Sequence, residues 1–128
     1  MSKTNNKQSE AAYVKGCEYL EDELFSEAAE CFQTAAEQGH AGAQSALGHL
    51  YMGGTGVEED HKRGVMWLRK AAAQNHPAAC FALGYNYLNG FGLKQNNEEA
   101  KKWFQKAIEN GSRTAQMWLD TLNEQKEG

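Results

Sequence analysis

The apolar positions of the chain recur with the spacing of amphipathic helices. In residues 43–51 the alanine, leucine and tyrosine positions follow one another three or four residues apart, and residues 64–72 show the same spacing around a tryptophan. Such a period predicts helices that each bury one face. The two patterns return in order at 79–87 and 100–108. We therefore predict an all-α chain built from pairs of helices that are joined by turns.

An internal repeat of 36 residues underlies this pattern. Residues 43–78 placed on 79–114 give ten identities, against about two expected from average composition. We interpret the small residues as positions that let two helices approach closely, and the rings as the groups that fill the space beside them. The identical pairs are Ala43/Ala79, Ala46/Ala82, Leu47/Leu83, Gly48/Gly84, Tyr51/Tyr87, Gly54/Gly90, Gly56/Gly92, Trp67/Trp103, Lys70/Lys106 and Ala71/Ala107.

The two ends of the chain depart from the repeat. Gly16 and Tyr19 align with the second copy only when four residues are removed, which predicts a shorter turn between the first two helices. Asp120 replaces the repeated glycine and Asn123 the repeated tyrosine, so we expect a polar closing helix. We predict one domain over 10–124, with disordered tails at 1–9 and 125–128. Its parts are repeats 11–42, 43–78 and 79–114 and a closing helix at 115–124.

Residues that begin and end helices stand at the expected places. Asp60 and Asn96 are N-cap residues, and Glu99, three positions after Asn96, fits a capping box. Pro77 suits the first turn of a helix. Glycine or asparagine recurs every 36 residues where a left-handed C-terminal cap is expected, at Gly39, Asn75 and Gly111.

These residues resemble the Sel1-like repeat (SLR), a tetratricopeptide-type helix pair with a loop lengthened by a G-x-G element. The pattern A-x-x-L-G-x-x-Y, a glycine loop, an acidic cap and A-x-x-W-x-x-K-A-A is met closely by 43–78 and 79–114. The first copy has Lys15 in place of leucine and Cys31 in place of tryptophan. The resemblance implies an α-solenoid of about three and a half helix-turn-helix repeats, wound as a right-handed superhelix.

By this resemblance, the first helix of each pair lines an inner groove that binds a partner. Aromatic and methionine side chains, which are enriched where proteins meet, are frequent among the expected groove residues. For Tyr13 and Phe81, burial against a neighbouring helix is an equal alternative. The expected groove residues are Tyr13, Cys17, Leu20, Ser45, His49, Met52, Phe81, Tyr85, Leu88 and Met117.

Composition narrows the possible partners. The net charge of −4 opposes binding to phosphate backbones, so we expect no nucleic-acid partner. The chain has no run of about 20 apolar residues, which argues against a membrane partner. Three cysteines without a CxxC spacing favour a reducing compartment, and we predict a cytoplasmic protein.

Residue patterns for catalysis or cofactor binding are missing from the sequence. The four histidines show no i, i+4 pair, so we expect no metal site. The loops GGTG and NGFG lack the lysine and hydroxyl residue of a phosphate loop, and we expect no cofactor. Cys17 and Cys31 lie on helices expected to face each other, yet as small apolar residues they need no catalytic role. We predict that the protein is not an enzyme.

Two functions fit these observations. The first is a scaffold or adaptor whose groove binds a peptide or a helix of another protein, because SLR proteins resemble assembly, signalling or host-contact factors, often bacterial. The alternative is an inhibitor or immunity-type protein that binds an enzyme through its convex face and loops, with Phe91 as a contact. The chaperone-tail clamp of other tetratricopeptide domains is not expected, because Tyr13, Cys17, Ser45 and His49 stand where it needs basic residues and asparagine.

Overall fold

The computed structural model describes the backbone of residues 2–127 and the side chains of residues 6–125. Within residues 2–127 the chain forms helices and no strands, so the predicted all-α class is confirmed. The helices are α1 (Ser2–Glu21), α2 (Phe25–Glu37), α3 (Ala41–Gly53), α4 (His61–Ala73), α5 (Pro77–Asn89), α6 (Asn97–Glu109) and α7 (Thr114–Glu127).

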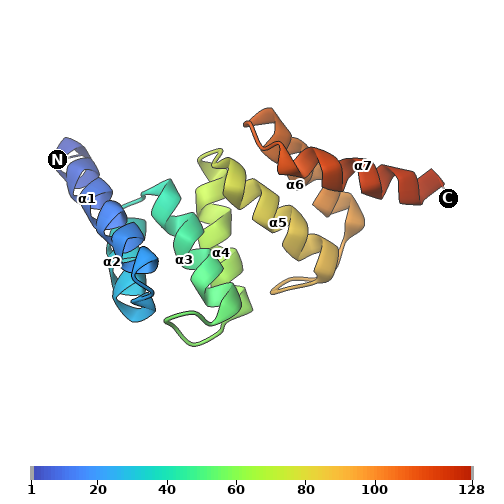
Figure 1. The fold of residues 1–128 in the computed structure, drawn as a ribbon. Coiled ribbons are helices and arrows are strands. Elements are labelled where there is room, and N and C mark those ends of the chain that lie inside the picture. The colour runs from blue at the N-terminus through green and yellow to red at the C-terminus, as the bar shows by residue number, and fades with distance from the viewer. Residues whose placement is uncertain (1, 128) are drawn as a thin grey trace.

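The helices stack in chain order as a solenoid (Figure 1). Contacts are most extensive within the pairs α1/α2, α3/α4 and α5/α6, and the second helix of each pair then packs on the first helix of the next. Figure 1 shows the N-terminus and C-terminus at opposite ends of this row. The turn between α1 and α2 spans residues 22–24, whereas the equivalent turn between α3 and α4 spans 54–60, so the shorter first turn is confirmed.

Glycines in the first helices allow each pair to close. A Cβ atom on Gly48 would lie 2.8 Å from the side chain of Leu68, and one on Gly84 would lie 2.6 Å from the ring of Phe104. Gly16 has the same role in the first pair. These distances are shorter than interior packing permits, so the repeated glycine is a close-approach position, as the sequence predicts.

The two repeated tryptophans have matching surroundings. Trp67 is 7% exposed, and the Lys70 Nζ atom lies 5.8 Å from its ring centre. Trp103 packs against buried apolar residues of helices α4 to α7, and the Lys106 Nζ atom lies 5.2 Å from its ring centre. Trp67 is buried and Trp103 partly buried, but both pack on a core cluster beneath a lysine three residues on, so the repeat records packing contacts between helix pairs.

The buried residues form two core clusters. The first core cluster joins α2 and α3 with Trp67 of α4, and Phe32 is fully buried in it. The second core cluster joins α5, α6 and α7 with the other buried apolar residues of α4, and Phe104 is fully buried in it. Helix α4 therefore belongs to both clusters and connects the two halves of the chain.

The helix ends follow the predicted caps. The side-chain oxygens of Asp60 and Asn96 each accept a backbone N–H three residues on, at 3.1 Å. The second bond of the capping box, from the Asn96 N–H to the Glu99 carboxylate, does not form. The Asn96 N–H donates to the carbonyl of Tyr87 instead, and the Glu99 carboxylate pairs with Lys102 at 3.2 Å. The predicted left-handed caps are confirmed by positive φ angles at Gly39, Asn75 and Gly111.

Element boundaries differ from the sequence-based ones. The second and third pairs begin at residues 41 and 77, two residues before the expected 43 and 79, because the capping residues His40 and His76 directly precede the helices. Helix α1 extends through residues 2–9, where we expected a disordered tail. The Ser9 side chain is 4% exposed and its hydroxyl donates to the carbonyl of Asn6 at 3.0 Å.

The C-terminal helix is longer than the predicted 115–124. It extends from Thr114 to Glu127, and so includes most of the expected tail at 125–128; residues 1 and 128 lie outside the described residues. Asp120 is exposed and accepts a hydrogen bond from Gln116 at 2.9 Å. Asp120 stands at the position of the repeated glycine, so its carboxylate occupies the place at which α6 approaches α5 in the preceding pair.

Candidate functional site

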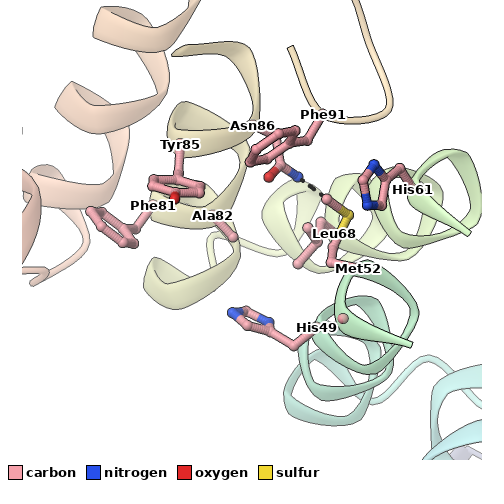
Figure 2. Close-up of a pocket in the computed structure, with 10 residues that line it drawn as sticks. His49, Met52, His61, Leu68, Phe81, Ala82, Tyr85, Asn86 and Phe91 are labelled. Atoms are coloured by element: carbon pink, nitrogen blue, oxygen red, sulfur yellow. Dashed lines mark hydrogen bonds between the residues drawn. The ribbon is translucent and has the colours of Figure 1, made fainter. Parts of the chain in front are cut away.

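A cavity of about 490 Å³ lies where α3, α4 and α5 meet. Its volume is in the range of ligand-binding pockets. Figure 2 shows side chains from these three helices and from the loop after α5 around one space. We call it the α3–α5 cavity, and it is lined by His49, Met52, Gly53, His61, Leu68, Phe81, Ala82, Tyr85, Asn86 and Phe91.

Four of the ten expected groove residues meet in this cavity. They are His49 and Met52 of α3 and Phe81 and Tyr85 of α5. The side chain of His49 extends from α3 toward α5 (Figure 2). Tyr85 is 38% exposed. Equivalent positions of two neighbouring repeats therefore come together, as expected if the first helices of successive pairs share one binding surface.

Other expected groove residues lie elsewhere. Tyr13 stacks on His40 with ring centres 4.5 Å apart and also contacts Phe32, so it takes the alternative of burial against a neighbouring helix. Ser45 is only 4% exposed. Cys17 and Leu20 pack against the first core cluster, Leu88 packs against the second, and Met117 is 72% exposed on α7. None of these six residues lines the α3–α5 cavity.

Several lining residues were not expected from the sequence. The sequence does carry a signal for Asn86: a polar residue stands there where the second repeat has the apolar Leu50. Phe91 lies in the loop after α5 and is 37% exposed, as a loop contact requires, and it also lines the cavity. Its ring centre lies 5.6 Å from that of His61 and 6.1 Å from that of Tyr85, because the loop after α5 folds back over the cavity.

Aromatic rings continue from the cavity to the closing helix. Tyr85 meets Trp118 of α7 edge-on with ring centres 5.6 Å apart. Phe81 lies 5.5 Å from Phe104 and 6.1 Å from Trp118. Such tilted and edge-on pairs are favourable and hold the rings in fixed orientations. The sequence left two alternatives for Phe81, burial against a neighbouring helix and a place in the groove. Phe81 packs against its neighbours and also lines the cavity, so it combines both.

Two hydrogen-bond acceptors face the cavity. Asn86 is 3% exposed, and its amide nitrogen makes a long contact of 3.8 Å with the Met52 sulfur (Figure 2). Its side-chain amide oxygen has no hydrogen-bond donor among the described residues, whereas its backbone carbonyl accepts the N–H groups of Gly90 and Phe91. The His49 Nδ1 atom donates to the Ser45 carbonyl at 2.9 Å, which leaves Nε2 as an acceptor in the neutral ring.

Charge is missing from the two helices that face each other across the cavity. The sequences of α3 and α5 contain no aspartate, glutamate, lysine or arginine. At the cavity edge, His61 pairs with Glu59 at 2.9 Å, so a proton on this ring is balanced by a carboxylate. The α3–α5 cavity is therefore an apolar, neutral surface with a few polar atoms.

His76 differs from its equivalent His40 in the preceding repeat. The His40 Nδ1 atom accepts the Ala43 N–H at 3.0 Å and Nε2 contacts Glu10 at 2.6 Å, whereas the buried Nδ1 atom of His76 has no partner. Burial, with smaller contributions from His40 and His49, lowers the pKa of His76 below its ordinary value. The folded protein therefore favours the neutral ring.

This difference predicts how stability depends on pH. The unfolded chain binds a proton at His76 near pH 6.5 and the folded chain only at lower pH, so the free energy of unfolding should fall as the pH drops below about 6.5. His76→Asn should remove this part of the dependence. It should also raise stability at pH 7.5 by about 1 kcal/mol, because asparagine can cap α5.

Urea denaturation of both proteins at pH 7.5 and pH 5.5 measures the two effects. The wild-type protein should lose more stability between these pH values than the variant. Equal losses would show that His76 does not contribute, because all other titrating groups are shared by the two proteins.

The cysteines are not set up as nucleophiles. Burial raises the pKa of the Cys31 and Cys80 thiols, which keeps them protonated. Cys17 interacts with the Tyr13 hydroxyl, and burial together with this hydrogen bond raises the pKa of Tyr13.

Among the described residues, no group of three or more histidine, cysteine, aspartate or glutamate side chains could hold a metal ion. No helix within residues 2–127 is long and apolar enough to span a bilayer.

A stack of helical hairpins, with an apolar cavity between the first helices of two neighbouring pairs, defines a helical-repeat protein of the solenoid class. The model of the Sel1 repeat matches residues 22–40, 41–76 and 77–112, whose later boundaries agree with the observed starts of α3 and α5. These matches cover more than half of the chain. The chain belongs to the Sel1 repeat family, as the sequence resemblance predicts.

Solved structures of Sel1-like repeat proteins share this fold. A protective antigen of uropathogenic Escherichia coli with an SLR fold is 32% identical with a TM-score of 0.79, over 84% of this chain and 24% of that one. A Sel1 repeat protein from Oxalobacter formigenes is 35% identical with a TM-score of 0.79, over 88% of this chain and 48% of that one.

A third similar structure is cysteine-rich protein B of Helicobacter pylori. It is 28% identical with a TM-score of 0.69, over 88% of this chain and 87% of that one. The chain thus spans less than half the length of the first two proteins. A comparison with curated proteins found no match.

Proposed function

We propose that the protein is a non-enzymatic scaffold that binds a peptide or helix of another protein in the α3–α5 cavity. Sel1 repeats generally mediate protein–protein interaction, and this general role applies to the chain. The observation that supports the specific proposal is the convergence of Phe81, Tyr85 and Phe91 on one accessible, charge-free cavity. Aromatic side chains in such pockets supply much of the binding energy in protein complexes.

The polar groups of the site suit binding better than catalysis. Catalysis by acid and base needs two titratable groups within reach of a reacting atom. The cavity contains His49 and His61, but its lining has no serine, cysteine, aspartate or glutamate that could act beside them as a nucleophile or second acid–base group. The free thiols suit a reducing compartment, and a cytoplasmic location stays part of the proposal.

A comparison of variants tests this function. The full chain, immobilised, would capture partners from lysate of the source organism, with binding then measured for each purified partner. Tyr85→Ala should weaken binding about tenfold or more, because it removes a central aromatic contact. His49→Ala should also weaken it.

Met66→Ala serves as the matched control. Met66 is 42% exposed on α4, close to the 38% of Tyr85, and does not line the cavity. Its removal should leave binding within about twofold, because isolated surface contacts contribute little. A loss in Met66→Ala with full binding in Tyr85→Ala would contradict the proposal and favour the alternative, an inhibitor or immunity-type protein that binds through its convex face and loops.

A further inference from the structure

We propose that the α3–α5 cavity binds a tryptophan side chain presented by a neutral, apolar segment of the partner protein. This inference rests on the proposed function and names the chemical group that the cavity takes. It is carried by three properties of the cavity: its charge, its walls and its hydrogen-bonding atoms.

The absence of charge on the facing helices restricts the partner segment. Because α3 and α5 contain no charged residue, a lysine, arginine or carboxylate entering from the partner would lose its water without gaining an opposite charge. The one charged pair at the edge, His61 with Glu59, is balanced internally. Charge complementarity therefore favours a neutral segment.

The walls of the cavity favour a large flat side chain. Phe81 and Tyr85 of α5 and Phe91 of the following loop present rings, and Met52 and Leu68 lie opposite. Tyr85 and Phe91 have ring centres 6.1 Å apart, and both are more than one-third exposed. Such rings and a polarisable sulfur make favourable contacts with another aromatic group. The cavity of about 490 Å³ has room for the largest side chain.

The hydrogen-bond acceptors of the cavity favour a ligand group that donates a hydrogen bond. The Asn86 side-chain amide oxygen has no donor among the described residues, and the His49 Nε2 atom is an acceptor in the neutral ring because Nδ1 donates to the Ser45 carbonyl. A ligand that covers these acceptors displaces their water and must bring a hydrogen to replace it. Tryptophan combines the largest apolar ring with an N–H that only donates, so it matches both the walls and these atoms.

The test uses small neutral probes on the full chain. N-acetyl-tryptophanamide would be titrated into the ¹⁵N-labelled protein and followed by NMR. The shifts should map to the residues around His49, Tyr85 and Phe91. The 1-methyl derivative of the same probe lacks the indole N–H and should bind about three- to tenfold more weakly, as the loss of one neutral hydrogen bond predicts. N-acetyl-phenylalaninamide should also bind more weakly, and N-acetyl-argininamide should give no saturable shifts.

Asn86→Leu provides the matched variant. The second repeat carries Leu50 at the equivalent position, so leucine is compatible with this helix. In the variant, the tryptophan probe should lose part of its advantage over the 1-methyl derivative, because one of the two acceptors is gone and only His49 Nε2 remains. If the variant fails to fold, the comparison of the two probes on the wild-type protein still decides.

Several outcomes would overturn the inference. They are equal binding of the tryptophan and 1-methyl probes to the wild-type protein, equal or tighter binding of the phenylalanine probe, saturable binding of the arginine probe, shifts outside the cavity, or no saturable binding at all. Shifts that change when the protein alone is diluted would assign the cavity to a second copy of this chain and would also overturn it. Because Tyr85→Ala tests partner binding separately, a failure of this inference can be told apart from a failure of the proposed function.

Discussion

Replacing Phe104 by alanine is expected to lower the free energy of unfolding by about 3–5 kcal/mol. Phe104 is fully buried, and its ring centre lies 5.5 Å from that of Phe81 and 6.1 Å from that of Trp118. Its ring also packs directly on Gly84, which has no side chain to fill the space that it leaves. Since the total stability of a domain is about 5–15 kcal/mol, this loss would remove a large part of it.

Urea denaturation measures this effect, and Phe25→Ala is its control. Phe25 is the same residue type at the start of α2 but is 38% exposed, so its replacement should cost about 1 kcal/mol or less. Similar losses for the two variants would contradict the assignment of Phe104 to the centre of the second core cluster.

Replacing Gly92 by alanine is expected to destabilise the protein by about 2–4 kcal/mol, from backbone strain and overpacking together. Gly92 has a φ angle of +78°, and a Cβ atom there would lie 2.5 Å from the carbonyl oxygen of His61. The loop after α5 therefore rests directly on the first residue of α4. A methyl group would push the two backbones apart and disturb the contact between the second and third pairs.

Gly90 in the same loop provides a control with nearly the same backbone angle. Its φ is +73°, but the nearest atom to an added Cβ is the Gln95 Cβ at 3.3 Å. Gly90→Ala should cost only about 1 kcal/mol, which is the backbone strain without the collision. Thermal or urea unfolding of both variants separates the two contributions. An equal cost would show that close approach to α4 is unimportant.

The fold could be predicted because packing contacts recur in the sequence. Gly48 and Gly84, with Trp67 and Trp103, mark the closeness of neighbouring helices directly through residue size. The N-caps at Asp60 and Asn96 depend on a local bond three residues on, so they too are readable. The start of α1 was missed because the polar residues before Ser9 show no apolar period, although they are compatible with a helix.

The cavity could be predicted only in part. His49 and Tyr85 occupy equivalent positions of successive repeats, so their meeting follows from the solenoid. Phe91 was expected in an exposed loop, but its place at the cavity could not be predicted, because the path of a loop over α5 depends on tertiary contacts, here those of Gly92 with α4. For Tyr13 the sequence left burial and a groove position as equal alternatives, because its partner His40 lies in the turn between two pairs, where the apolar pattern gives no information.

The division of the interior into two core clusters affects how the protein can evolve. The cavity residues Phe81 and Met52 pack against the second core cluster, whereas α2 belongs to the first. Substitutions in α1 and α2 can therefore accumulate with little effect on the cavity, and the cysteine at the position of the repeated tryptophan fits such divergence. Conversely, a few side chains of α3 and α5 can reshape the cavity while α1 and α2 are inherited unaltered.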